Sequence, residues 1–453
     1  MKHDMTVGKE WKLILLFTLP IMAGNILQQL YNIIDGIIVG NFVGELSFAS
    51  VATSGPLVLM YLALAFGLSV GVGITVSQYF GAGKDDELPI AIDTALILLG
   101  VCGLIFTGVG MILSPHMLRI ILNVPEEIFP EAVTYMRIYS AGLFFQFMYN
   151  CIASTLRGIG DSKATLYFLI VSAILNIILT FIFVITIKWG VAGAAFSTVL
   201  AQAVCATVSY IYLRKRFPFI KGGKHFDIKL AKTMIKLGLP IAVQMSLISL
   251  GNGAMQRLVN SFGVTTPAVV PAYGAAVRLD ALVFVPMSGF QAGLASFTGQ
   301  NIGAGKLERV RTGLRSSLVM AVLCTVFISL CYYIFAETIV GFFGLSNESL
   351  VIGTSIVRYF TFFFWILACN MMFSGVLQGA GDTVIITLAT LTSLSTRVVL
   401  GYLAAHFEIL GYSAAWMPVP LGWLFWATII YSRYFSGKWK NKAVAGRLSH
   451  ESN

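Results

Sequence analysis

The heptapeptide QYFGAGK at Gln78–Lys84 returns as QNIGAGK at Gln300–Lys306, 222 residues further along the chain. Glycines ahead of a lysine resemble the phosphate-binding loop, which reads G-x-x-x-x-G-K and continues with Ser or Thr. Both copies have glutamine in place of the first glycine, and neither has a hydroxyl residue after the lysine. The heptads therefore do not predict nucleotide binding, and their recurrence needs another explanation.

The composition is that of a membrane protein. Hydrophobic residues make up 57% of the 453 positions and charged residues only 11%, with a mean hydropathy of +0.84. Ordinary soluble proteins are about a quarter charged, so a soluble domain with this balance lacks the polar groups to cover its surface. The cysteines and histidines stand singly, without the spacing of a metal site, and no nucleophile with its base can be assembled. We therefore expect no cofactor and no enzyme.

The apolar pattern predicts twelve membrane spans, since a span needs roughly 20 mainly apolar residues. The first six lie near 13–41, 50–79, 90–114, 130–156, 163–187 and 191–213. The second six lie near 233–262, 268–299, 314–336, 351–377, 383–405 and 411–433.

Lysine and arginine gather on one side of this topology. The densest group is the central loop from Arg214 to Lys236, while the opposite side carries acidic residues such as Glu126 and Glu348. The positive-inside rule then predicts that both termini are cytoplasmic. The net charge of +10 marks the cytoplasmic face, and we expect no nucleic-acid partner.

The heptads belong to a duplicated unit. Other matching pairs follow in the same order at nearly the same distance: FTLP (Phe17–Pro20) with LGLP (Leu237–Pro240), RGIGD (Arg157–Asp161) with QGAGD (Gln378–Asp382), and GVAGAAF from Gly190 with GYSAAW from Gly411. The predicted fold is an all-α integral membrane protein with two parallel six-helix repeats around a central cleft. We expect an N-terminal lobe at 1–213, a cytoplasmic linker at 214–232, and a C-terminal lobe with a cytoplasmic tail at 233–453.

In such a topology the GAGK and GxGD turns lie on the cytoplasmic face, where glycine ends a helix. They are interpreted as hinges or stops without a catalytic role.

Polar residues at membrane depth are costly and are therefore functional candidates. Asn25, Gln28, Asn32 and Asp35 recur at helical spacing on one face of the first span, and Asp35 is its acidic residue. Asn176 and Thr180 share a face of the fifth span, and Thr198 lies in the sixth, so the predicted ion-binding set is Asp35, Asn176, Thr180 and Thr198. A carboxylate with neutral oxygens suits a hard monovalent cation, and burial equally favours a proton carrier.

The second repeat does not copy this set. A shift of 221 places Gln256 at the position of Asp35 and Arg397 at that of Asn176. Its acidic candidate is Asp280, two residues from Arg278. Structural ion pairs and gating roles are both open for Asp280, Arg257, Arg278 and Arg397.

Further polar stripes run along the fourth span, through Gln146, Asn150 and Ser154, and along the seventh, through Asn252 and Gln256. Each stripe either lines a water-filled cleft or joins helices. The candidates for a substrate cleft are Gln28, Asn32, Gln146, Asn150, Asn252, Gln256, Arg278 and Asp280.

Taken together, the stretch LPIMAGNILQQLYNIIDGIIVGNFVG, the paired GAGK and GxGD turns, and GVAGAAFST resemble the multidrug and toxic compound extrusion (MATE) family. The resemblance covers nearly the whole chain. It implies a multi-pass antiporter of a bacterial or archaeal inner membrane, which exports drugs or metabolites, often amphipathic organic cations, in exchange for Na⁺ or H⁺. It also implies two lobes that rock around the cleft.

Many prokaryotic members of that family bind a cation through an Asp on helix 1, an Asn and an Asp on helix 5, and a Thr on helix 6. Three of these fall on Asp35, Asn176 and Thr198, whereas Thr180 stands where the second Asp is expected. A site with one carboxylate binds a cation more weakly, so the coupling ion is left open between Na⁺ and H⁺.

The alternative function is a flippase for a lipid-linked saccharide or peptide from the same wider superfamily, whose members commonly have fourteen spans. A channel fits less well, because the halves are unequal and repeated filter residues are absent. The expected partners are small-molecule substrates and membrane lipids, and a monomer suffices.

Overall fold

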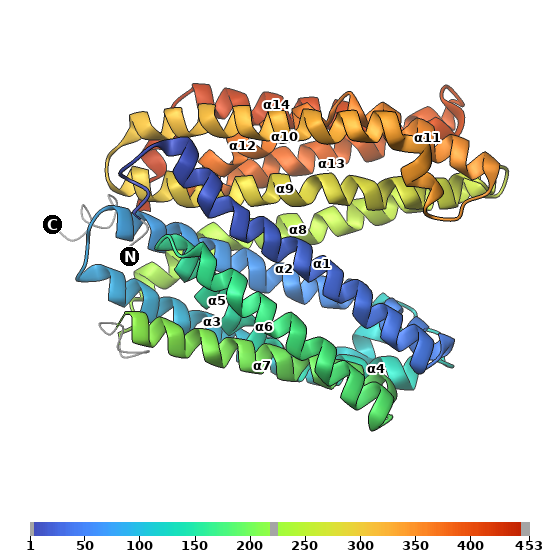
Figure 1. Cartoon of the computed structure of the whole chain (residues 1–453), viewed down its shortest axis with the longest axis horizontal. Helices are drawn as coiled ribbons and strands as arrows, with labels where there is room; N and C mark the ends of the chain where they lie inside the picture. The colour runs from blue at the N-terminus through green and yellow to red at the C-terminus, as the bar shows by residue number, and fades with distance from the viewer. Residues whose placement is uncertain (1–3, 218–224, 445–453) are drawn as a thin grey trace.

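The computed structural model describes residues 4–217 and 225–444; within them it leaves aside the side chains of 31–33, 35–37, 39–41, 45, 48 and 121. These ranges fold into long helices joined by short turns, and no strand occurs in them. Figure 1 shows the helices of the first repeat, blue to green, below those of the second, yellow to red.

Each repeat supplies seven of the α-helices in the described ranges. The first repeat contains α1 (Glu10–Phe42), α2 (Glu45–Gly81), α3 (Glu87–His116), α4 (Phe129–Ala141), α5 (Leu143–Gly158), α6 (Ser162–Thr180) and α7 (Gly190–Arg216). The second contains α8 (Ile228–Gly263), α9 (Val269–Gly303), α10 (Leu307–Gly341), α11 (Asn347–Thr361), α12 (Phe364–Gly379), α13 (Thr383–His406) and α14 (Val419–Phe435). Short π-helical and 3₁₀ segments are η1 (Met117–Ile121), η2 (Phe181–Thr186), η3 (Gly411–Ala415) and η4 (Lys438–Lys442).

The fourth and tenth predicted spans are each broken into two helices. Across the described ranges, ten helices are long and apolar enough to cross a membrane, or eleven if α11 and α12, bent by 49°, count as one span. The predicted span at 130–156 is occupied by α4 and α5 and falls outside that count. The breaks, at Gly142 and Phe363, are 221 residues apart, so the repeat preserves the kink although hydropathy does not reveal it.

The two repeats interlock through their first two helices. On α2, a Cβ at Gly67 or Gly71 would overlap the backbone of Ala242 or Met234 on α8. Their counterparts on α9, Gly289 and Gly293, face Met22 and Thr18 of α1 in the same way. The first helix of each repeat thus packs on the second helix of the other, with glycine letting the helices approach closely.

The GAGK turns meet each other at one end of the bundle. A Cβ at Gly81 would overlap the backbone oxygen of Gln300, and one at Gly303 would overlap that of Gln78. Gly83 and Gly305 have positive φ angles of 65° and 72°, the usual conformation of a glycine just past a helix end. The predicted stops are confirmed, and each heptad also supplies a contact between the repeats.

Glutamines of the heptads tie three parts of the chain together. The Gln78 amide donates to the Gly379 carbonyl and the Gln300 amide to the Gly158 carbonyl, both at 2.9 Å across the repeats. Their side-chain oxygens accept from the backbone N–H groups of Val444 and Met5, respectively. The first and last described segments therefore join this end of the bundle, where N and C are marked in Figure 1.

The GxGD aspartates fix the last helix of each repeat. Asp161 accepts a hydrogen bond from the Tyr212 hydroxyl at 2.7 Å, and Asp382 forms an ion pair with Arg433. Tyr212 and Arg433 are 221 residues apart, so the same contact is made with different chemistry.

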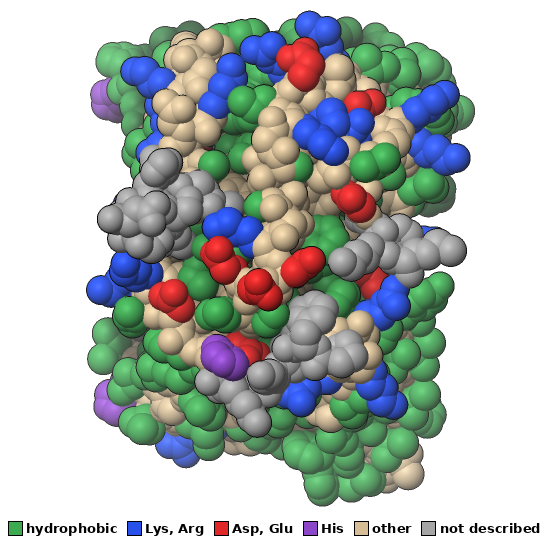
Figure 2. Space-filling model, turned by 90° about the vertical axis from the view of Figure 1, so that its left-hand side faces the viewer, with side chains coloured by type: hydrophobic (Ala, Val, Ile, Leu, Met, Phe, Trp, Pro, Cys, Tyr) green, Lys and Arg blue, Asp and Glu red, His purple; other side chains and the backbone are tan. Residues whose placement is uncertain are grey.

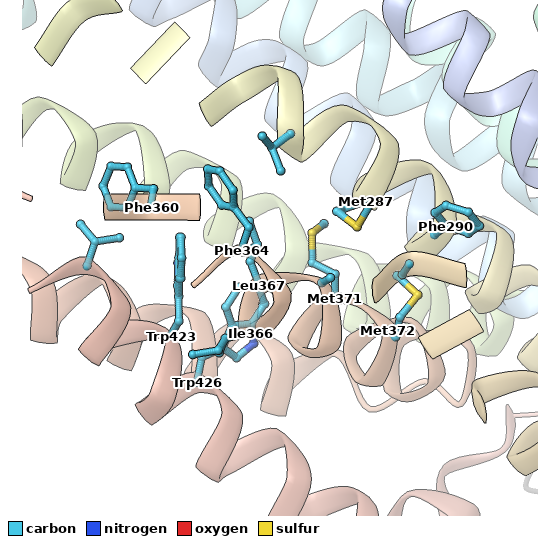
Figure 3. Close-up of a cluster of buried hydrophobic side chains, with 14 of the residues drawn as sticks. Met287, Phe290, Phe360, Phe364, Ile366, Leu367, Met371, Met372, Trp423 and Trp426 are labelled. Atoms are coloured by element: carbon cyan, nitrogen blue, oxygen red, sulfur yellow. The ribbon is translucent and has the colours of Figure 1, made fainter. Parts of the chain in front are cut away.

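The largest hydrophobic core lies inside the second repeat. Phe360 and Phe364, which flank the break between α11 and α12, pack on Trp423 of α14 with ring centroids 6.1 and 6.3 Å away, as Figure 3 shows. Met287 and Met371 continue this core toward α9. These aromatic residues are structural, as expected for most of the phenylalanines.

The face that carries the GAGK turns is rich in charge. Figure 2 views this end of the molecule and shows Lys and Arg side chains around its rim with several carboxylates near the middle. Lys306 of the second heptad donates to the Thr6 carbonyl at 3.0 Å, and Arg309 pairs with Glu10 at 3.0 Å. The positive charges thus also anchor the segment that leads into α1.

Gly81→Ala is expected to destabilise the protein by about 1–3 kcal/mol, because the added methyl group meets a backbone oxygen that cannot move as a side chain can. Thermal unfolding of the purified protein measures the loss. Gly55→Ala is the matched control, since it lies in the same helix with nothing within 4 Å of the added carbon. Equal unfolding midpoints for the two variants would contradict the close contact.

Gln300→Leu is expected to loosen the segment around Met5, because it leaves a buried N–H and a buried C=O unpaired, at about 1–3 kcal/mol each. Hydrogen exchange at residues 5–9 should become faster. Gln244→Leu is the control, because the Gln244 side chain bonds only to Thr390 of its own repeat among the printed partners. Unchanged exchange in the Gln300 variant would show that the segment is held by other contacts.

Candidate ion and substrate sites

A polar cluster joins α6 and α7 inside the first repeat. The Asn176 amide donates to the Thr198 hydroxyl at 3.2 Å, and the Thr180 and Ser197 hydroxyls are 2.8 Å apart. Asn176 and Thr180 are buried, and Asn176 Oδ1 has no hydrogen-bond partner among the described residues. The structure brings together Asn176, Thr180 and Thr198, and adds Ser197, which the spacing argument did not select.

Asp35 lies on the outer half of α1, but its side chain and that of Asn32 are outside the described residues. The helix itself is well placed for the predicted site, because α1 packs along α6 and touches η2 and α7. Ile38, three residues after Asp35, packs with Val184 and Ala194, one turn before Thr198. The backbone around Asp35 therefore runs beside the polar cluster.

A second polar site is a cavity of about 150 Å³ between the two repeats. Residues of α1, α2, α5, α9 and α12 line it, so both repeats contribute. Asn25 of α1 donates to the Ser288 hydroxyl of α9 at 3.4 Å along one wall. Ser77, next to Gln78 of the first heptad, is also among its lining residues, which places the cavity just above the contact between the GAGK turns.

None of the eight predicted cleft residues lines this cavity. Asn25 and Ser154, however, continue the stripes that contain Gln28 and Gln146. Gln28 is half-buried, and Asn150 donates to the carbonyl of the buried Gln146 at 2.8 Å. The stripes thus point along the helices toward the cavity.

The charged candidates of the second repeat form a separate group. Arg397 of α13 donates to the Asn252 side chain of α8 and interacts electrostatically with Asp280 of α9. One oxygen of the Asp280 carboxylate is buried without a hydrogen-bond partner among the described residues. Arg278 is exposed, and the Gln256 amide donates to Asn260 on its own helix at 2.9 Å.

Two functional candidates, Arg157 and Gln378, were missed because the sequence places them in turn motifs. They begin RGIGD and QGAGD, whose glycines and aspartates had accounted for the whole pattern. Both line the cavity between the repeats. The useful signal was their equivalence, since residues 221 apart in a pseudo-symmetric pair of repeats face the same axis.

A polar cluster within one repeat, a cavity between two repeats and a bundle of membrane-length helices define a membrane carrier. The MatE family model matches the chain at residues 20–182 and 240–403, one match in each repeat. The chain therefore belongs to the MatE family, and it is a multidrug efflux transporter of the MATE type.

Individual relatives agree with this assignment. The chain is 31% identical to the probable multidrug resistance protein YpnP of Bacillus subtilis over 97% of this chain and 98% of that protein. It superposes with a TM-score of 0.88 on the crystal structure of MATE in complex with MaL6, at 25% identity over 97% and 99% of the two chains. It is also 20% identical to the FAD transporter of Shewanella oneidensis over 81% of this chain and 80% of that protein.

Proposed function

We propose that this protein is a secondary antiporter of a bacterial or archaeal inner membrane, with both termini cytoplasmic, and that it exchanges exported drugs or metabolites for Na⁺ or H⁺. The observation that carries the coupling proposal is the unpartnered, buried Asn176 oxygen beside Thr198 and the backbone of Asp35. A carbonyl oxygen in that position is a ligand for a hard cation, or an acceptor for a protonated carboxyl group.

The proposed mechanism is alternating access. The repeats are in contact at the end with the GAGK turns, and their helices diverge toward the other end in Figure 1. An ion or proton that enters from the open side neutralises Asp35 and changes the balance between this state and one with the GAGK contacts broken. It does so only by its difference in affinity for the two states, so the surroundings of Asp35 must differ between them.

Amphipathic organic cations are the substrates expected from the resemblance, and small molecules and membrane lipids are the only proposed partners. The name of one relative, an FAD transporter, indicates that substrates in this fold extend beyond drugs. No cofactor is proposed besides the coupling ion, and one chain with its two repeats suffices as a monomer. The flippase alternative is not favoured.

Asp35→Asn is expected to abolish the acceleration of efflux by an ion gradient, because an amide neither ionises nor contributes a charge to cation binding. The measurement is efflux of a fluorescent organic cation from proteoliposomes with Na⁺ and H⁺ gradients imposed separately. Acceleration of the wild type by one gradient identifies the ion. Gradient-driven efflux that survives in the variant would remove Asp35 from the mechanism.

Thr180→Asp is expected to strengthen Na⁺ binding roughly tenfold, because it adds a second carboxylate to a site of neutral oxygens, and affinity follows the number of charged ligands. Thr180→Val is the control for loss of the hydroxyl alone. Thermal stabilisation by Na⁺, titrated with choline as the balancing cation, measures the affinity. If the Asp variant responds to Na⁺ no better than the Val variant, Thr180 does not face the ion.

A further inference from the structure

The cavity between the repeats holds one charged side chain among its lining residues, Arg157. This residue is half-buried at the end of α5, and its Nη2 lies 3.4 Å from the Ser154 hydroxyl. No carboxylate of the described residues lies within 4 Å of it. The other polar groups of the cavity are neutral hydroxyls and amides, so the guanidinium charge is balanced by no neighbour in the described structure.

An unpaired charge at membrane depth is expensive, so its position requires a reason. The turn that follows α5 does not provide one, because the second repeat builds the same turn without an arginine. Gln378 occupies the equivalent position, and Gly381 repeats the positive φ of Gly160, at 87° and 91°. Gln378 instead accepts a neutral hydrogen bond from Gln291 at 3.0 Å. The backbone geometry is therefore independent of the charge.

We propose that Arg157 binds an anionic group of the transported substrate, so that amphipathic molecules carrying a carboxylate or phosphate are preferred over simple organic cations. The inference rests on the export function proposed above and specifies its substrate class. A planar guanidinium presents paired N–H donors that match the two oxygens of a carboxylate or phosphate. It disfavours a purely cationic molecule at the same place by like-charge repulsion.

The dimensions of the cavity agree with this role. About 150 Å³ accommodates a small acidic group and part of a ring, but not a whole drug-sized molecule, whose usual site is several hundred cubic ångströms. Phe66 and Ile21 give one side of the cavity an apolar surface, while Asn25 and Ser288 offer hydrogen bonds beside the guanidinium. The acidic group is therefore placed at the floor of the cavity, with the apolar body of the substrate between the diverging lobes.

A matched pair of dyes tests the assignment. Rhodamine B carries a fixed cation and a free carboxylate, and its methyl ester carries the same cation with the acid masked. Fluorescence anisotropy with the purified full-length protein gives both dissociation constants, and proteoliposome efflux gives both transport rates. The wild type is expected to bind the free acid about ten- to a hundredfold more tightly than the ester, as hydrogen bonds to a charged group allow.

Arg157→Gln, which copies the residue of the second repeat, is expected to reduce this preference to about one. Arg157→Lys, which keeps the charge, is expected to retain part of it. Arg358→Gln is the control for charge removal, because Arg358 is exposed on α11, away from the cavity.

Wild-type protein that binds the two dyes equally would overturn the role of Arg157 while leaving the export function intact, and so would a preference that persists in Arg157→Gln. Because the wild-type comparison is decisive alone, a variant that fails to fold does not rescue the inference. Wild-type protein that moves neither dye under either ion gradient counts against the export function itself, and the inference then falls with it.

Discussion

The close approach of α2 to α8 and of α9 to α1 is the constraint on which the rest of this structure depends. Four glycines, Gly67 and Gly71 in one repeat and Gly289 and Gly293 in the other, let these helices approach closer than any side chain permits. Polar groups gain nothing from lipid, so tight packing of small residues is the main available force between membrane helices. Because these contacts lie toward the end with the GAGK turns, the repeats are joined there, and the cavity is left just above the junction.

Duplication supplied one backbone, and the two copies then took different side chains at equivalent places. Asn176 of the polar cluster corresponds to Arg397, and Arg157 of the cavity corresponds to Gln378. In the first pair, the second repeat has a fixed cation where the first offers a free amide oxygen. A permanently charged guanidinium cannot bind and release an ion, so a reversible ion site of this design is confined to the first repeat.

The sequence was sufficient for the fold because its signals are local and repeated: apolar length, basic loops, and motifs about 221 residues apart. It missed the breaks at Gly142 and Phe363, since apolar residues continue through both and packing decides where such helices bend. Helical spacing correctly grouped Asn176 with Thr180. The cavity was beyond such reasoning, because Arg157, Ser288 and Gln378 come from three helices that only tertiary packing brings together.

Helix α1 provides a physical route from the proposed ion site to the junction between the repeats. Its first half packs on α9 of the second repeat through Thr18 and Met22, whereas its outer half packs on α6 and beside Val184 of the first repeat. Pro20 lies within the first of these halves and removes one backbone hydrogen bond, which makes bending there less costly. A change of charge at Asp35 therefore acts on a helix that both repeats hold. Any shift of its outer half relative to α6 is transmitted to the glycine contacts that keep the GAGK end closed.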